Sequence, residues 1–138
     1  EVGSGVFARR VWMGHAKMNT PMRLMVGETE NAPGAWSSFP PHKHDSDIPP
    51  EKKYDEVYYF RISPPSGFGF MRVYSPGEFD RAYCVRDGDA IQVPGGYHPV
   101  VSAPGCRLRY IWALYGMERQ YGVWSYDPDF TSLGELPK

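Results

Sequence analysis

The chain is built from short runs rich in β-branched and aromatic residues, separated by clusters of glycine, proline and small polar residues. The clearest runs are residues 56–62 and 107–114. Such runs are typical of β-strands, and counting by twos along the first of them places Glu56, Tyr58 and Phe60 on one face. Further strands are expected at residues 9–12, 22–26, 68–74, 81–85, 90–93 and 99–102. No segment indicates a helix of ordinary length.

The turns between these runs are equally well marked. The segment 63–67 contains two prolines and ends in glycine, and the strand after it ends at Ser75-Pro76-Gly77-Glu78, which indicates a hairpin. With 15 Gly and 14 Pro in 138 residues, the composition favours many short strands and tight turns. The length suits one compact domain. We therefore expect a single all-β domain over residues 1–130 and a loose tail over residues 131–138.

Charge and cysteine content argue against several classes of protein. A net charge of −1 offers no basic surface to nucleic acid. No run approaches the roughly 18 apolar residues that a membrane span needs, and no secretory signal opens the chain. The two cysteines, Cys84 and Cys106, are too few for a disulfide scaffold and are expected to be small buried or half-buried side chains. We expect a soluble, cytoplasmic protein.

Three of the four histidines fall in two motifs suited to a metal. His42 and His44 lie two residues apart after a pair of prolines, so on a strand both rings point to the same side. His98 follows a Pro-Gly-Gly turn that leads out of the short strand 90–93. These motifs can bring three imidazole rings together from distant parts of the chain.

Glu56 completes the predicted site. It opens the strand 56–62, which can lie beside the segment that carries His42 and His44 and supply a carboxylate. A lone histidine is usually a surface residue, and His15, which has no partner at a suitable spacing, is interpreted in that way. The combination of motifs predicts one metal site inside a β-barrel, formed by His42, His44, Glu56 and His98.

Several segments, spread over nearly the whole chain, also resemble those of a known protein family. They are Gly27-Glu28-Thr29, residues 36–45, Glu56-Val57-Tyr58-Tyr59, Gly67-Phe68-Gly69-Phe70, Asp87, residues 93–100 and Asp127-Pro128-Asp129. Together they resemble the 5-deoxyglucuronate isomerases of myo-inositol catabolism, and the Trp-Ser-Ser and Gly-Tyr-His-Pro-Val blocks are the most specific. The resemblance implies a cupin fold, which is a double-stranded β-helix or jelly-roll barrel.

The chain departs from the family in two respects. Family members consist of two cupin-like halves, and this chain resembles the C-terminal, metal-carrying half. Met71 stands where a glutamine is expected in the family, a change that bears on the choice of substrate. The four metal ligands all match the family pattern.

The resemblance implies isomerisation between the aldose and ketose forms of a deoxy-uronic acid such as 5-deoxyglucuronate, in which a proton moves between neighbouring carbons. A divalent ion would polarise the carbonyl and the adjacent hydroxyl, and the ligand count does not choose between Zn, Mn, Fe and Ni. Tyr58 is our first candidate for a hydroxyl beside the substrate, with a core aromatic as the alternative. Arg72 could clamp the substrate carboxylate or face outward as a surface arginine. Lys43, between the two histidines, should point away from the metal.

Two other functions stay open from the sequence. One is an Fe(II)-dependent cupin oxygenase, and the other is a non-catalytic module that binds a metal and a sugar. A homodimer is expected, because a short barrel exposes sheet edges and aromatic strands to a partner. Trp12, Trp112 and Trp124 are the aromatic residues in question, unless they fill the core of the monomer.

Overall fold

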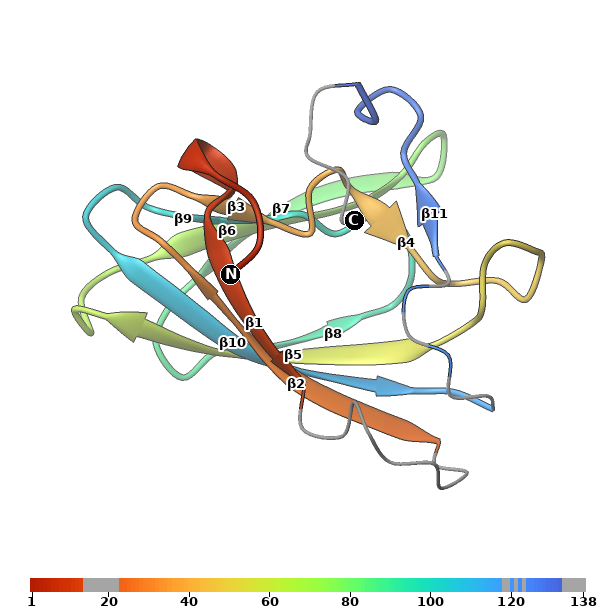
Figure 1. Ribbon diagram of the computed structural model, residues 1–138, viewed down its shortest axis with the longest axis horizontal. Helices are drawn as coiled ribbons and strands as arrows, with labels where there is room; N and C mark the ends of the chain where they lie inside the picture. The colour runs from red at the N-terminus through yellow and green to blue at the C-terminus, as the bar shows by residue number, and fades with distance from the viewer. Residues whose placement is uncertain (14–22, 118–119, 121, 123, 133–138) are drawn as a thin grey trace.

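The computed structural model describes residues 1–13, 23–117, 120, 122 and 124–132, and apart from one turn of 3-10 helix the regular elements of this described part are all β-strands. Two antiparallel sheets face each other, with the larger sheet in the lower half of Figure 1 and the smaller one above it. A third, two-stranded sheet lies at one end, formed by β4 (His42–Lys43) and β11 (Ser125–Tyr126). The prediction of an all-β domain is therefore confirmed.

The larger sheet has the strand order β1-β2-β10-β5-β8. Its strands are β1 (Arg9–Met13), β2 (Leu24–Asn31), β10 (Arg107–Tyr115), β5 (Asp55–Ser63) and β8 (Ala90–Val93). Residues distant in sequence become neighbours here, because β10 pairs with β2 on one side and with β5 on the other. A one-turn 3-10 helix, Gly5–Phe7, precedes β1.

The smaller sheet has the order β3-β9-β6-β7. It contains β3 (Trp36–Ser37), β9 (Val100–Ser102), β6 (Gly69–Ser75) and β7 (Phe79–Val85). β6 and β7 pair along their whole length, from Gly69 opposite Val85 to Ser75 opposite Phe79. This pairing confirms the predicted hairpin.

The core lies between the two sheets. Side chains alternate strictly between buried and exposed along β5, so Glu56, Tyr58 and Phe60 all point inward, as the count by twos predicts. Phe60 and Leu108 from the larger sheet pack into one cluster with Met71 from the smaller sheet, and all three are fully buried. Glu56 and Tyr58 are thus fixed on the wall of a packed core.

Most of the predicted strands are present, and three details differ. β4 pairs with β11 rather than with β5, and its link to β5 is a single backbone hydrogen bond from Tyr54 N to His44 O (2.9 Å). β11 was not predicted. Cys84 is exposed rather than buried or half-buried, whereas Cys106 is buried.

Two predictions fall wholly or largely outside the described residues. These are the surface position of His15 and the loose tail, of which only residues 131 and 132 are described, as an exposed turn. No helix in the described part of the chain is both long and apolar enough to cross a bilayer.

Candidate metal centre

Three histidine rings meet at one end of a cavity that the larger sheet lines. One nitrogen from each of His42, His44 and His98 lies within 4.8 Å of the corresponding nitrogens of the other two. The ring centroids of His42 and His98 are 4.8 Å apart, and those of His44 and His98 are 5.0 Å apart. The structure therefore brings together the three histidines that the two sequence motifs singled out.

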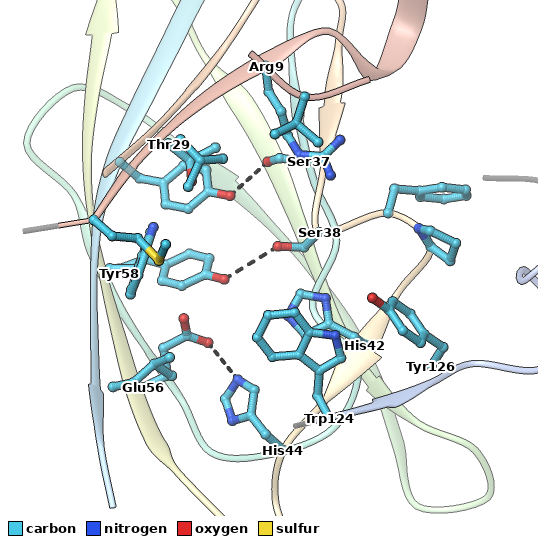
Figure 2. A pocket seen from close by; sticks show the side chains of 18 residues that line it. Arg9, Thr29, Ser37, Ser38, His42, His44, Glu56, Tyr58, Trp124 and Tyr126 are labelled. Atoms are coloured by element: carbon cyan, nitrogen blue, oxygen red, sulfur yellow. Dashed lines mark hydrogen bonds and ion pairs between the residues drawn. The ribbon is translucent and has the colours of Figure 1, made fainter. Parts of the chain in front are cut away.

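Glu56 lies in the same cluster. Its Oε2 atom is 3.1 Å from Nε2 of His44 and 3.2 Å from Nε2 of His98. Figure 2 shows the Glu56 carboxylate of β5 directed at the His44 ring. All four predicted ligands thus share one location, with Glu56, His44 and His98 at least 95% buried.

Backbone carbonyls fix the orientation of two rings. Nδ1 of His44 lies 3.2 Å from the carbonyl oxygen of Tyr54, and Nδ1 of His98 lies 2.8 Å from that of Gly96. A carbonyl only accepts hydrogen bonds, so each Nδ1 carries a proton, and in a neutral ring Nε2 then presents a lone pair. This arrangement is the one that metal-ligating histidines usually have.

The cluster fits a cation because its centre is otherwise filled with acceptors. In neutral rings of this tautomer, Nε2 of His44 and Nε2 of His98 both direct lone pairs at the Glu56 carboxylate, and Nε2 of His98 forms no hydrogen bond. Buried acceptors that face one another are unfavourable unless a proton or a metal ion lies between them. Three imidazoles and a carboxylate are ligands for Zn, Mn, Fe or Ni.

The charges in the cluster are strongly coupled. Burial alone would raise the pKa of Glu56, but His44 and His98, when they are protonated, outweigh it and lower this pKa to about 2. Burial would lower the pKa of His44, but Glu56 raises it. Burial, followed by the charges of His98 and His44, lowers the pKa of His42 well below its usual value. The carboxylate is therefore ionised, and His42 is neutral at physiological pH.

A polar network connects the two segments that carry the histidines. Asp45 Oδ2 accepts a hydrogen bond from Gly96 N (2.7 Å), and Glu51 accepts from the backbone of Asp45 and Ser46 (2.7 Å each). Lys43 Nζ bridges Asp45 (2.6 Å) and Glu51 (3.0 Å), so it points away from the metal cluster as expected. The network holds the His42–His44 segment against the turn before His98.

The cavity has a volume of about 380 Å³, within the range of small-molecule sites. Aromatic residues form much of its wall, and Trp124 stacks on His42 with ring centroids 4.7 Å apart. Tyr126 lines the same side, which Figure 2 shows at the right of the cluster. Such a wall excludes water and can pack against the carbon–hydrogen faces of a sugar.

Tyr58 lies on the cavity wall next to the cluster. Its hydroxyl is 3.5 Å from the Ser38 hydroxyl, and its ring stacks on Tyr110 (4.6 Å). Burial, together with the charge of Glu56, raises the pKa of Tyr58 well above its usual value. Tyr58 therefore keeps its proton at neutral pH.

The structure does not bring Arg72 to the cavity. Its guanidinium forms a bidentate pair with Asp80 (2.9 and 2.7 Å) and lies over the ring of Tyr74, on the outer side of the smaller sheet. The surface alternative fits this position. Met71 is likewise a core residue between the sheets and is absent from the described lining of the cavity.

Sequence reasoning missed several residues of the site. Arg9 and Ser38 line the cavity together with Trp124 and Tyr126, although none of these residues was singled out as part of the site. Trp112 is 5% exposed and also lines the cavity, so it belongs to the monomer and not to a dimer surface, whereas Trp12 is 47% exposed. Short elements far apart in sequence gave no periodic signal for these contacts.

Comparison with known proteins gives a consistent result. The model of the KduI/IolB family matches residues 1–133. A 5-deoxy-glucuronate isomerase of Geobacillus kaustophilus (strain HTA426) is 39% identical over 131 residues, which cover 92% of this chain and 46% of that protein. One from Shouchella clausii (strain KSM-K16) is 41% identical over 109 residues, or 78% of this chain and 39% of that protein. The chain spans less than half the length of these relatives.

Solved structures support the fold. The crystal structure of an IolB-like protein from Salmonella typhimurium LT2 matches with a TM-score of 0.87 at 31% identity, over 95% of this chain and 50% of that one. A cupin-like protein from Thermotoga maritima MSB8 matches with a TM-score of 0.59 at 18% identity, over 86% and 75%. The second likeness concerns the fold alone, and together they confirm the expected cupin fold.

Proposed function

Since the chain belongs to the KduI/IolB family, we propose that it is a metal-dependent sugar isomerase acting on 5-deoxyglucuronate or a similar deoxy-uronic acid. The reaction would interconvert an aldose and a ketose. The observation that supports this best is the meeting of three imidazole rings and the Glu56 carboxylate at one end of a cavity of sugar size.

His42, His44, His98 and Glu56 are the residues that would hold a divalent ion. A bound ion supplies Lewis-acid polarisation of a carbonyl and its neighbouring hydroxyl, which lowers the cost of moving a proton between the two carbons. The chain's own contribution is to orient the sugar and to keep water out, through the aromatic wall beside His42.

Tyr58 is the proposed proton-bearing group of the chain. Because its pKa is raised, the phenol remains protonated and acts as a hydrogen-bond donor to a substrate oxygen rather than as a base. Its stacking on Tyr110 fixes the ring, so the hydroxyl is held in place before the substrate binds.

The test is an isomerase assay with 5-deoxyglucuronate on protein loaded with Zn, Mn, Fe or Ni in turn. We expect turnover that a chelator abolishes and that one of these metals restores. If the protein binds metal and uronate but shows no turnover, the result would contradict the isomerase proposal and support a non-catalytic binding module. Iron-dependent consumption of O₂ would instead support the oxygenase.

We also propose that the protein forms a homodimer. Support comes from an apolar stripe on the outer face of the larger sheet, where Val57, Tyr59 and Ile111 are each more than 40% exposed. Light scattering is expected to give twice the mass of one chain. A mass equal to one chain at all concentrations would contradict the dimer.

A further inference from the structure

Arg9 is a buried cation within the cavity. It is the first residue of β1, is 9% exposed, and lines the same cavity as His42, His44 and Glu56. Backbone contacts fix its position, since Arg9 N and O pair with Val2 across the chain and the strand register places it opposite Asn31. These contacts fix the backbone from which the Arg9 side chain reaches the cavity wall.

Among the described residues, Arg9 has no carboxylate counter-ion, whereas several exposed arginines do. Arg61, Arg72 and Arg107, which are all roughly half exposed, each pair with a carboxylate within 2.8 Å. Within the described residues, no carboxylate lies within ion-pairing distance of Arg9, and its one side-chain hydrogen bond runs from Nη1 to the carbonyl of Phe7 (3.1 Å). A guanidinium has five N–H donors, so most of its donors stay available.

A buried charge without a partner is costly, and such groups usually pair with a ligand or another charge. The described lining of the cavity contains no lysine and no arginine other than Arg9. A single planar guanidinium matches a carboxylate, which it can bind through two parallel hydrogen bonds. A phosphate dianion would call for more cations than this wall offers.

The cavity places Arg9 at one end and Glu56 and His44 at the other. In Figure 2, Arg9 extends from the upper edge toward Ser37 and Ser38, whereas Glu56 and His44 lie at the lower edge. An open-chain uronic acid has its carbonyl at one end and its carboxylate at the other. The two ends of the cavity therefore correspond to the two functional ends of such a molecule.

We propose that Arg9 is the anchor for the substrate carboxylate and selects sugar acids over neutral sugars. This rests on the proposed function, because it takes the carbonyl end of the substrate to lie at the histidine cluster. The hydroxyl of Ser38, which lines the cavity between these ends, is placed to contact a hydroxyl of the sugar chain.

The test compares two linear molecules that no isomerase can turn over. L-gulonate carries a terminal carboxylate, and D-glucitol has a hydroxymethyl group in its place. Calorimetric titration of the metal-loaded protein is expected to show gulonate binding at least about tenfold tighter than glucitol, and R9Q is expected to abolish the difference. The matched control is R10Q, because Arg10 is the next residue and its side chain is 55% exposed.

The outcomes separate this proposal from the proposed function. R9Q could bind gulonate and glucitol equally while the wild type fails to turn over 5-deoxyglucuronate. This result would overturn the proposed isomerase activity and support Arg9 as the carboxylate anchor. Discrimination that survives in R9Q would overturn the anchor, since it would place the carboxylate on the metal. If R9Q does not fold, R9K serves: weaker gulonate binding with unchanged glucitol binding supports the proposal, and unchanged gulonate binding overturns it.

Discussion

His98 illustrates how individual residues define the site. It is fully buried, its Nδ1 is held by the carbonyl of Gly96, and its Nε2 faces Glu56 at 3.2 Å without forming a hydrogen bond. Burial of an imidazole in this state is unfavourable unless something binds the free lone pair. His44 Nε2 faces the same carboxylate oxygen at 3.1 Å, so a single cation at this point could contact both rings and the carboxylate.

The proposed role of the Tyr58 hydroxyl can be tested with a single substitution. Y58F keeps the ring and its stacking on Tyr110 and removes only the hydroxyl, so we expect kcat to fall by about a hundredfold or more with unchanged metal content. The matched control is Y59F, because Tyr59 lies on the outer face of the same strand and is 41% exposed. Equal kcat values for Y58F and wild type would exclude a catalytic hydroxyl at this position.

Residue types and spacing were enough to predict the four candidate ligands, because two-residue periodicity on a strand fixes which side chains share a face. The same rule could have excluded Arg72 from the interior. Met71 and Val73 on either side of it are apolar and buried, so the arginine between them must face outward. Arg9 could not be assigned from sequence, because nothing local distinguishes an arginine that lacks a counter-ion.

At the scale of elements, the turn before His98 determines whether the site can form. Gly96 has φ of +78°, donates its N–H to Asp45 and accepts from His98 Nδ1. A Cβ at this position would lie 2.5 Å from the carbonyl oxygen of Tyr74. The turn therefore requires glycine for both its conformation and its packing.

G96A is expected to weaken metal binding by about tenfold or more, since loss of a group that orients a metal-ligating histidine typically lowers the metal affinity by that factor. The variant should also unfold more easily, which thermal melting of the metal-free protein would show. G105A is the matched control, because Gly105 has φ of +77° but open space around its Cβ position. Equal metal affinities for the two variants would show that the turn does not support His98.

β2 and β10 are joined by a buried carboxylate. Glu30 accepts hydrogen bonds from Arg107 and Arg109 (2.6 Å each), and its own side chain is 6% exposed. The hydrogen bond from Arg109 is the largest cause that lowers the pKa of Glu30 below its usual value of 4.5. Because the folded-state pKa is the lower one, this carboxylate stabilises the fold above pH 4.5 and loses that contribution as the pH falls further.

E30Q is therefore expected to reduce the free energy of unfolding by about 1–3 kcal/mol at pH 7, as for hydrogen bonds to charged groups. The difference from wild type should shrink as the pH is lowered from 4.5. Urea denaturation at several pH values measures both effects. E28Q is the control, because among the described residues the ion pair of Glu28 is with Arg109 alone and its side chain is more exposed. A difference that does not depend on pH would contradict the role of the charge.

Strand order was less accessible from sequence than strand position. β4 and β11 have two residues each and pair across more than eighty positions of the chain, and such short elements leave no periodic pattern. The pairing nevertheless determines one side of the cavity, because β11 brings Tyr126 opposite His42. The long strands β5 and β10, by contrast, were predicted nearly to the residue.

For the molecule as a whole, the site joins parts of the fold that are distant in sequence. Glu56 comes from the larger sheet and His98 from the turn that leads into the smaller sheet. His42 comes from β4, in the two-stranded sheet at one end of the molecule. A ligand that binds all of them binds the folded state only. Metal binding and folding stability are therefore linked.

A divalent ion at about 100 times its dissociation constant is expected to stabilise the fold by about 2.7 kcal/mol and to raise Tm by several degrees. A chelator should reverse the shift. H98A should show no shift with metal, whereas H15A, which alters the histidine outside both motifs, should behave as the wild type. An equal metal-dependent shift in H98A would locate the ion elsewhere.

The most direct test of the account is crystallography of the metal-loaded protein with data collected on both sides of the metal's absorption edge. We expect one anomalous peak about 2.0–2.3 Å from a ring nitrogen of each of the three histidines and from a carboxylate oxygen of Glu56. These distances are usual for such ligands. A strong peak elsewhere, or none at these four side chains in protein that retains its metal, would contradict it.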